Sequence, residues 1–447
     1  MFPKQEAGSM YRYLICLIAL VPQLVTADNL PAPVVDTDYR PIDLAEAALG
    51  QLLFYDPILS GNKQVACATC HHPRHGASDG LSLGLGDGGL GLGPDRTTDT
   101  SNLPEQRIPR NSPALFNLGA REFTVLFHDG RIALDATRTS GLRTPLDDDM
   151  AVGFASLLSA QTMFPVLSPD EMAGHYGEND VSQAVRQGLI TGQGGAWDII
   201  ARRVADLDAY VDRFSAVYPH IEAADDVQFT DISNAVAAFM EFEWRSDTAP
   251  FDAYLRGAQI LPALASQGAD LFYGDAGCSG CHSGAYQTDH DFHAMGAAQI
   301  GPGKAARFES HARDEGRMRV TGDPADAYKF RTPSLRNIAV TGPYGHAGAH
   351  ASLDTFIRSH IDPVNALATY DPSETVLPDL DVNDFRVMND ETELAAIMAA
   401  VTVRPVMLVD GDIDALLAFL DSLTDTAAMV GRLGVPATVP SGLPVQR

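Results

Sequence analysis

The sequence predicts a mostly α-helical protein made of two related domains with long loops. Apolar residues recur at helical spacing in many segments, whereas the alternating pattern of a β-strand is scarce. The second observation is a large repeat, because a helical segment ending in Leu-Phe-Tyr precedes a Cys-x-x-Cys-His unit in both halves of the chain. The chain has 447 residues, of which 45% are hydrophobic, so it is long enough to bury two ordinary cores.

The N-terminus has the pattern of a signal peptide. Lys4 and Arg12 supply positive charge, residues 13–25 form a short apolar run, and Val25-Thr26-Ala27 offers small residues at a cleavage site. We therefore expect residues 1–27 to be removed on export to the periplasm, together with Cys16. A retained N-terminal anchor is the alternative.

The expected elements follow in chain order. Residues 29–41 form a Pro-rich lead-in, and residues 42–55 form a helix that ends at Asp56-Pro57. The Gly-rich stretch 80–93 must be a loop. Further helices are expected at residues 181–190, 196–217, 231–244, 262–273, 353–360, 391–401 and 413–423. We place the N-terminal domain at residues 28–246 and the C-terminal domain at residues 247–447.

The charge of the chain excludes one class of partner. With 31 Lys and Arg residues against 58 Asp and Glu residues, the formal net charge is −27. The phosphates of a nucleic acid would be repelled by such a surface. The charge fits solubility outside the cytoplasm or a positively charged partner, and the choice between the two stays open.

Two short motifs predict the cofactor. They are Cys67-Ala68-Thr69-Cys70-His71 and Cys278-Ser279-Gly280-Cys281-His282. Two thiols at this spacing can each form a thioether to one vinyl group of a porphyrin, and the histidine that follows then ligates the iron. A redox dithiol needs no following histidine, and a four-cysteine zinc site would not require both histidines. The sequence therefore predicts two covalently bound haem c groups, one in each domain.

Seven ordered blocks between residues 49 and 425 resemble the bacterial di-haem cytochrome c peroxidase and MauG family. They are LGQLLFYDPILSGNKQVACATCHHP, RNSPALFNL, FHDGR, FPVLSPDEM, GCSGCHSG, FRTPSLRNIAVTGPYGHAG and IDALLAFLDSLTD. The resemblance implies two all-α cytochrome c-like domains whose haems face each other across the interface. It also implies that the N-terminal haem meets peroxide and that the C-terminal haem passes electrons.

The resemblance also implies a set of residues at the peroxide haem. Glu171 falls where the family places its catalytic glutamate, and Gln161 and Pro165 match the spacing of the distal pocket. Peroxide cleavage needs a group that moves a proton from the inner to the outer oxygen, so we expect Glu171 to act as acid and base and Gln161 to donate or accept a hydrogen bond. The alternative for Glu171 is a solvated surface carboxylate.

Peroxidases of this family often carry a distal histidine on a mobile loop after the first haem motif. The corresponding region here is the Gly-rich loop, which contains no histidine. His72 and His75 are too close to the motif to reach over the ring easily, and we expect both at the surface. The first haem should then be open in the resting state and should need no reductive activation.

The second haem departs from the family pattern at its distal ligand. In the family this ligand lies fourteen residues after the histidine of a PYxH motif, and it is methionine in the peroxidases and tyrosine in MauG. The motif histidine here is His346, so the corresponding residue is His360. We expect His282 and His360 to ligate the iron together and to lower its reduction potential relative to a methionine ligand. Ligation by His350 or a nearby methionine is the alternative.

Three aromatic positions complete the comparison with the family. His128 stands in FHDGR where the family has a tryptophan between the haems, and we expect it to be a hydrogen-bonding residue at the interface. Trp197 and Trp244 lie outside that motif and are expected in the core.

The family also holds a calcium ion near the domain interface. By alignment its protein ligands would be the side chain of Asn111 and the carbonyls of Thr341 and Pro343, with water completing an oxygen shell. The alternative is that Asn111 is a turn residue before Ser112-Pro113.

Three functions compete for this sequence. The first is a peroxidase that reduces hydrogen peroxide with electrons from a small redox protein, such as a cytochrome c or a cupredoxin. The second is a MauG-like oxidase that modifies residues of a partner protein. The third is a pure electron carrier, which an intact set of Glu171, Gln161 and Pro165 argues against. Family members are often dimers, so a homodimer is expected from the resemblance alone.

Overall fold

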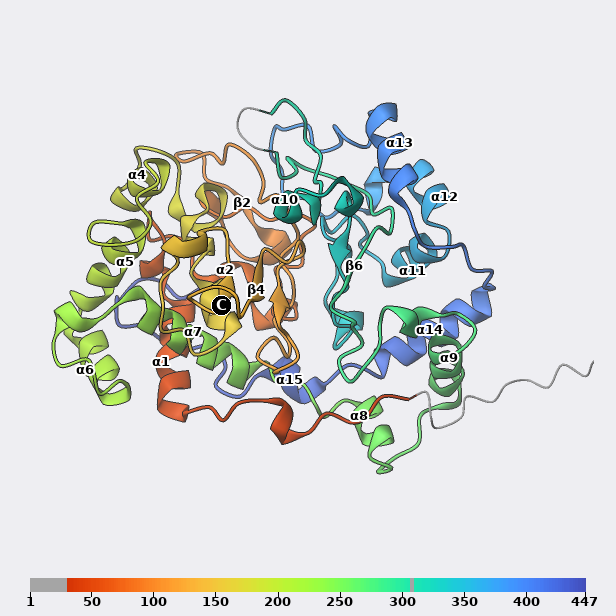
Figure 1. Cartoon of the computed structure of the whole chain (residues 1–447), viewed down its shortest axis with the longest axis horizontal. Helices are drawn as coiled ribbons and strands as arrows, with labels where there is room; N and C mark the ends of the chain where they lie inside the picture. Colours follow the sequence, from red (N-terminus) through yellow and green to blue (C-terminus); the bar gives the residue numbers. More distant parts are fainter. Residues whose placement is uncertain (1–29, 306–308) are drawn as a thin grey trace, which may run out of the picture.

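The computed structural model describes residues 30–305 and 309–447, so the predicted signal peptide lies outside the described residues. The described chain is mostly helical, with long irregular connections and small antiparallel sheets, which confirms the predicted secondary-structure class. Two halves lie side by side in Figure 1, one holding α1 to α7 and the other holding α9 to α14. Every described helix is too short or too polar to cross a lipid bilayer.

The helices of the first half are α1 (Leu44–Tyr55), α2 (Cys67–Cys70), α3 (Leu157–Thr162), α4 (Asp180–Arg186), α5 (Ala196–Ala205), α6 (Asp208–Val217) and α7 (Phe229–Glu243). Those that follow are α8 (Pro250–Leu255), α9 (Ala263–Tyr273), α10 (Met318–Thr321), α11 (Leu353–Ile361), α12 (Pro363–Ala368), α13 (Glu391–Ala400), α14 (Asp410–Asp421) and α15 (Thr426–Val430).

The strands are short and form three antiparallel sheets. They are β1 (Gly89–Leu90) with β2 (Thr97–Thr98), then β3 (Val125–Leu126), β4 (Ile132–Leu134) and β5 (Leu142–Arg143) in that order, and β6 (Phe292–His293) with β7 (Phe330–Arg331). In the last sheet Phe292 pairs with Arg331 and His293 pairs with Phe330.

All the segments with helical spacing are helical, with one interruption. The predicted helix at residues 196–217 divides into α5 and α6, because Leu207 leaves the helical conformation with φ −105° and ψ 106°. Asp208 then opens the first turn of α6, where a carboxylate is favoured by the helix dipole.

The two halves share one helix crossing. In the first half, a Cβ added to Gly50 of α1 would lie 1.8 Å from the carbonyl oxygen of Ala235 in α7. In the second half, a Cβ added to Gly268 of α9 would lie 1.9 Å from the carbonyl oxygen of Ala415 in α14. Both crossings therefore need glycine, since any side chain would push the two helices apart.

Aromatic rings fill the core beside each crossing in the same way. Phe54 of α1 packs on Phe239 of α7 with ring centroids 5.2 Å apart, and Phe272 of α9 packs on Phe419 of α14 at 5.0 Å. The repeat seen in the sequence is thus a repeat of packing. Trp197 and Trp244 are both buried in the first core, as predicted.

The two ends of the described chain each pack on the core of the opposite half. Residues 431–447, called the C-terminal tail below, return to the first half, where Val439 is buried and Leu443 and Val445 pack on the first core. The last residue lies beside α2 (Figure 1). At the other end, Leu30 packs on the second core. The boundary that we placed between residues 246 and 247 stays a prediction.

Candidate active site

The first Cys-x-x-Cys-His motif forms the single helical turn α2. The Thr69 hydroxyl accepts a hydrogen bond from the Ala66 amide at 3.0 Å, which caps the start of this turn. His71 then leaves the helix, and its ring Nδ1 lies 3.2 Å from the Ala77 carbonyl oxygen. When Nδ1–H donates to a carbonyl, the imidazole is oriented and its Nε2 is left as the ligand atom. Burial lowers the pKa of His71 to about 4, so the ring is neutral at pH 7.

The second motif repeats this arrangement. The ring Nδ1 of His282 lies 3.1 Å from the carbonyl oxygen of Gln287, so its Nε2 is also left free to ligate. Burial and the nearby His360 lower the pKa of His282 to about 4. Both histidines are therefore held as neutral imidazoles with the same hydrogen-bonding side turned to the backbone.

The cysteines fit thioether attachment of a porphyrin better than the alternatives. All four described cysteines are unpaired thiols. Cys67 packs on the first core and Cys278 on the second, so the two pairs belong to different halves and cannot form a four-cysteine zinc site. Burial raises the pKa of Cys67 and Cys70 to about 12, which makes them poor redox thiols. Each half thus offers two thiols next to one neutral imidazole, which is the donor set of haem c.

His72 corrects one prediction. We expected it at the surface, but its side chain is buried, with Nδ1 accepting a hydrogen bond from the Arg74 amide at 3.2 Å and its ring against the edge of Tyr55. The short turn after the motif folds back under α1, and this long-range packing was not visible in the sequence. His75 is half-buried against Gly80 and Gly93 of the Gly-rich loop.

Glu171 lies on a π-helical turn, Pro169–Ala173, whose amides at residues 171, 172 and 173 all point to the Ser168 carbonyl. Such turns project a side chain in a direction that an α-helix cannot reach, and they are frequent at functional sites. Glu171 is near enough to the first motif to raise the pKa of Cys70 through its charge. Burial raises the pKa of Glu171 itself, so the side chain is not a solvated surface carboxylate.

The other two residues predicted for this pocket lie just upstream of that turn. Gln161 is in the last turn of α3, and its Oε1 is buried without a hydrogen-bond partner among the described residues. Pro165 begins the short 3-10 turn Pro165–Leu167, which packs on the π turn. Pro165 and Glu171 therefore lie on two consecutive tight turns, which follow the helix that carries Gln161.

The Gly-rich loop is a buried wall and not an exposed flap. Leu81, Leu83 and Leu85 are each buried, and a Cβ on Gly86 would lie 2.4 Å from the Glu171 carbonyl oxygen. The absence of side chains at these glycines lets the loop backbone approach the turn that holds Glu171.

Arg96 holds this loop, and the sequence did not reveal it. The guanidinium of Arg96 is buried and donates to the carbonyls of Leu85, Gly86 and Gly91 at 2.5, 2.6 and 2.7 Å. Nothing in the sequence separates such an arginine from one on the surface, because its partners are backbone atoms of a loop without a regular pattern.

Two cations act on Glu171 across the site. Lys304, from the second half, and Arg131, from the first, each favour the ionised form of the carboxyl and lower its pKa against the effect of burial. Burial and repulsion from neighbouring arginines lower the pKa of Lys304 to about 8. Neither residue was singled out from the sequence: Lys304 is a lone charge outside any motif, and Arg131, although it ends the FHDGR block, was given no role there.

The structure brings His360 to the second motif. His360 is in the last turn of α11, where its Nδ1 donates to the Phe356 carbonyl oxygen at 2.9 Å, so its Nε2 is free. Its charge would lower the pKa of His282, which places the two imidazoles as near neighbours. His350, the alternative ligand, has its Nδ1 3.0 Å from the Glu374 carboxylate.

Two further histidines lie between the halves. The His346 ring stacks on Phe330 with centroids 3.8 Å apart, and both of its nitrogens are buried without partners among the described residues. The carbonyl of His128 accepts a hydrogen bond from the Arg331 amide at 2.7 Å, which joins the first half to the second. Burial and the charge of Arg110 hold the pKa of His128 well below its usual range, so its ring is neutral.

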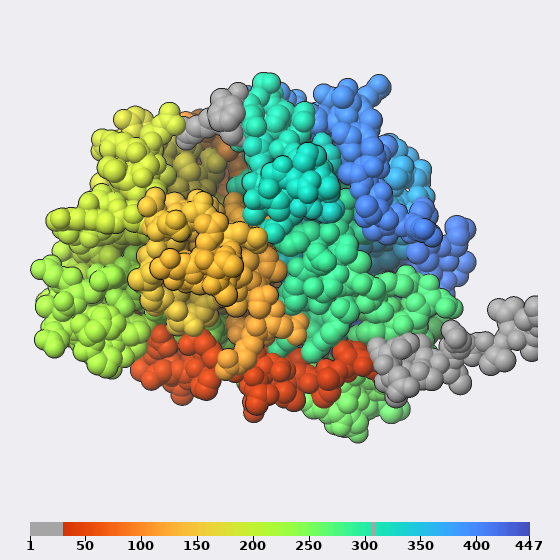
Figure 2. Space-filling view, in the orientation of Figure 1, coloured from red at the N-terminus to blue at the C-terminus, as the bar shows by residue number. Residues whose placement is uncertain are grey.

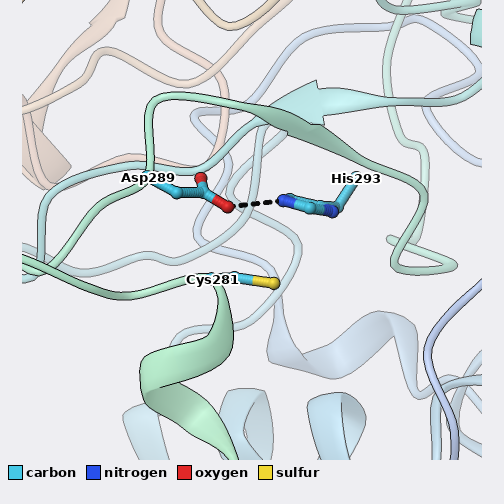
Figure 3. A group of neighbouring side chains, drawn as sticks. All are labelled: Cys281, Asp289 and His293. Carbon is cyan, nitrogen blue, oxygen red and sulfur yellow. Dashed lines mark hydrogen bonds and ion pairs between the residues drawn. The ribbon is translucent and has the colours of Figure 1, made fainter. Parts of the chain in front are cut away.

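A third group of donor atoms lies next to the second motif. Figure 3 shows the Asp289 carboxylate bonded to the His293 ring, at 2.8 Å, above the Cys281 sulfur. These three donor atoms lie within 4.8 Å of one another. Cys281 is one of the two thiols of the haem motif, so this group belongs to the surroundings of the second haem.

The residues predicted to bind calcium are placed as follows. The Asn111 side-chain amide is buried and donates to the carbonyls of Leu81 and Ser82 at 2.8 and 3.2 Å. Thr341 contacts the turn at Gly76, and Pro343 follows a cis peptide bond. Asn111 is thus more than a free turn residue, and the cation itself stays a prediction.

Two neutral histidines, each beside a pair of free thiols in its own core, define a c-type di-haem protein. The family model described as di-haem cytochrome c peroxidase matches residues 44–260. The chain is 29% identical over 420 residues to methylamine utilization protein MauG of Paracoccus denitrificans, covering 89% of this chain and 92% of that protein. It is 28% identical over 320 residues to cytochrome c551 peroxidase of Pseudomonas aeruginosa, covering 71% and 72%. The chain belongs to the di-haem cytochrome c peroxidase and MauG family.

A solved structure shares the fold. The diheme peroxidase BthA from Burkholderia thailandensis superposes with a TM-score of 0.58 at 20% sequence identity, over 93% of this chain and 94% of that one. The likeness extends over both halves, which the family model matches only in part.

Proposed function

We propose that this protein is a periplasmic di-haem peroxidase that reduces hydrogen peroxide to water with electrons from a small redox protein. Cys67, Cys70 and His71 would hold the haem that meets peroxide, and the second motif would hold the haem that passes electrons. The observation that carries the proposal is the position of Glu171, whose half-buried side chain lies on a π turn that packs against the Gly-rich loop, beside the first motif.

The chemistry needs a proton moved from one peroxide oxygen to the other. Haem iron supplies the site where peroxide binds and the electrons that cleave it. A carboxylate next to that site takes the proton from the inner oxygen and delivers it to the outer one, which then leaves as water. Burial raises the pKa of Glu171, so the carboxyl is a stronger base than an exposed glutamate, while Lys304 and Arg131 act against this rise by favouring the ionised form. The unpartnered Oε1 of Gln161 can accept a hydrogen bond from the peroxide.

An open first haem is part of the proposal. The Gly-rich loop carries no histidine, and Arg96 fixes its backbone by three hydrogen bonds. A loop held in this way supports a resting state in which no protein side chain has to leave before peroxide binds, so reductive activation is not needed.

The second haem would have two imidazole ligands, His282 and His360. Each is oriented by a hydrogen bond from its Nδ1 to a backbone carbonyl. A second imidazole in place of methionine lowers the reduction potential, so the donor protein must itself have a low potential. The chain's acidic charge favours a donor with a basic surface. Calcium held by Asn111, Thr341 and Pro343, and a homodimer, are proposed from the family alone.

A MauG-like oxidation of a partner protein is the second candidate. The relative from Paracoccus denitrificans is matched over 92% of its length, and the expected second ligand here is not the methionine of the peroxidases. His128, which stands where the family has a tryptophan between the haems, argues against this second candidate. A histidine ring is harder to oxidise than tryptophan and transmits oxidising equivalents less well.

Exchange of Glu171→Gln tests the proposed function. Loss of the base should lower kcat/KM for peroxide by about 10²- to 10⁴-fold, while the amide keeps the size of the side chain. Glu178→Gln, an exposed glutamate seven residues on, is the matched control and should leave turnover with reduced cytochrome c unchanged. Peroxide reactivity that survives Glu171→Gln would remove the assigned role of this residue.

Electron paramagnetic resonance of the oxidised protein tests the coordination. We expect one high-spin signal from the first haem and one low-spin signal of the two-imidazole type from the second. Two low-spin signals would mean that the first iron has a distal protein ligand, and the open resting state would then be wrong.

A further inference from the structure

A surface pocket lies on the first half, away from the Glu171 site. It has a volume of about 360 Å³ and is formed where the lead-in, the end of α7 and the C-terminal tail meet. The lead-in runs along one edge of the molecule beneath both halves (red in Figure 2). Tyr39, Arg40, Glu241, Phe242, Arg245 and Arg432 line the pocket.

The charge of this pocket is opposite to that of the chain. Three arginines and two carboxylates, Asp36 and Glu241, line it and give a formal charge of +1, although acidic residues outnumber basic ones by 58 to 31 in the whole sequence. Arg245 is neutralised, because it pairs with both Asp36 and Asp247 at 2.5 Å. The other two arginines, Arg40 and Arg432, do not use all of the N–H donors of their guanidinium groups.

Arg40 and Arg432 have donors to spare. The Nε of Arg40 bonds the Glu241 carboxylate at 2.5 Å, but one terminal nitrogen of its guanidinium is buried without a hydrogen-bond partner in the described chain. Arg432 is exposed, and its guanidinium lies over the Phe242 ring at 5.4 Å and donates, among the described residues, to the backbone carbonyls of Phe242 and Arg245. A guanidinium with free N–H groups binds a carboxylate or a related anion well.

An aromatic bridge leads from this pocket to the second haem motif. The Tyr39 ring, in the pocket wall, meets the Tyr286 ring edge-on with centroids 6.3 Å apart. Tyr286 is buried and precedes Gln287, whose carbonyl accepts the hydrogen bond from His282 Nδ1 at 3.1 Å. The route therefore contains one ring contact, one peptide and one hydrogen bond. Burial raises the pKa of both tyrosines, so they remain neutral rings.

We propose that this pocket binds a small anionic one-electron donor, of the enediolate or phenol-carboxylate class, and that Tyr39 and Tyr286 carry its electron towards the second haem. The inference rests on the proposed peroxidase function and adds a second entry for electrons beside the protein donor. Two donor molecules each lose one electron, and the two electrons with two protons reduce one hydrogen peroxide to two waters.

Reduction of the oxidised holoprotein by ascorbate, followed by stopped-flow absorbance without peroxide, tests the pocket. The rate should saturate with ascorbate concentration. Arg432→Gln should raise the half-saturating concentration about 10-fold or more, because a charged hydrogen bond is lost. The matched control is Arg202→Gln on α5, which removes an exposed guanidinium paired with Asp198, and it should have little effect. Neutral hydroquinone should not distinguish the two variants.

Binding alone gives a second readout. Calorimetric titration with 4-hydroxybenzoate should show a site that Arg432→Gln weakens and Arg202→Gln does not. Equal effects of the two variants, or a rate that rises linearly with ascorbate, would overturn the pocket. Peroxide turnover with reduced cytochrome c would continue in that case, so failure of this inference is distinct from failure of the proposed function.

The bridge is tested by Tyr286→Leu against Tyr286→Phe. Removal of the ring should lower the saturated reduction rate by ascorbate at least about 10-fold, with the half-saturating concentration unchanged, whereas phenylalanine should keep the rate. Turnover with reduced cytochrome c should be the same in both variants, which shows that they fold. An unchanged saturated rate in Tyr286→Leu would remove the bridge.

Discussion

The two haem motifs hold their histidines alike but are covered very differently. In the first motif Ala68 and Thr69 are buried, and the Thr69 hydroxyl donates to Gln446 of the C-terminal tail at 2.6 Å. In the second motif, the turn Cys278–Gly280 contains no buried residue. The same five-residue pattern is thus closed by a distant part of the chain in one half and left open in the other. This difference suits a first site that excludes water and a second site that electrons must reach.

The carboxylates beside the two motifs differ in the same sense. Asp79, near Cys70, is buried, and burial raises its pKa to about 7. Asp289, near Cys281, bonds the His293 ring, and its hydrogen bonds hold its pKa below the usual range. The first motif therefore lies in a dry environment and the second in a polar one.

The largest effect on stability is expected at the helix crossing that the two halves share. Gly50→Ala and Gly268→Ala should each lower the free energy of unfolding by about 3 kcal/mol or more, because the added methyl group meets a helix carbonyl at less than 2 Å. Gly411→Ala in α14 is the control, since a Cβ there meets nothing, and it should be neutral or slightly stabilising. Thermal unfolding followed by circular dichroism would measure all three. A mild effect at only one of the two crossings would show that the halves are not packed alike.

Exchange of one iron ligand should distinguish the two haems by their reduction potentials. His360→Met should raise the reduction potential of the second haem on the order of 0.1 V or more and leave that of the first nearly unchanged, because methionine favours the reduced iron. Spectroelectrochemical titration would measure both potentials, with His350→Gln as the control. A shift with His350→Gln and none with His360→Met would assign the ligand to His350.

The buried acid at the first motif predicts a dependence of stability on pH. Because the folded pKa of Asp79 lies near 7, above its unfolded value, the folded state binds more protons between about pH 4 and pH 7. Its contribution to the free energy of unfolding therefore falls as pH rises through this window.

Asp79→Asn should remove that dependence and stabilise the protein at pH 8 by about 1–2 kcal/mol, since the amide oxygen can still accept from the Leu81 amide. Urea unfolding at pH 5 and pH 8 would measure the difference. Asp289→Asn, at the second motif, should instead lose stability at pH 8, and equal behaviour of the two variants would contradict the contrast between the sites.

The smallest expected effect is at the cover of the first motif. Gln446→Ala removes the acceptor of the Thr69 hydroxyl and should lower the free energy of unfolding by about 1 kcal/mol. Thr69→Val keeps the size of the side chain but also removes the acceptor of the Ala66 amide, so its effect should be larger, and the double variant should show less than the sum of the two. A fully additive double variant would indicate that the two side chains do not interact.

The candidate site shows where sequence patterns carry information and where they stop. The haem motifs, the helix pattern and the repeat could be predicted, because each depends on residues close together in the chain. Arg96 and Lys304 could not, because their partners are backbone atoms or charges brought in from distant segments. The burial of His72 was missed for the same reason.

The sequence by itself determined which residues can carry this chemistry: two pairs of thiols with adjacent imidazoles, His360 at a fixed distance from the PYGH motif, and a glutamate in family register. Only the tertiary structure decided which motif is closed and which is open, because the cover of the first motif comes from the opposite end of the chain. It also decided that a loop of glycines, which has no side-chain pattern to read, is a rigid wall against Glu171. Local spacing limits what a residue can do, and long-range packing sets the water, charge and access around it.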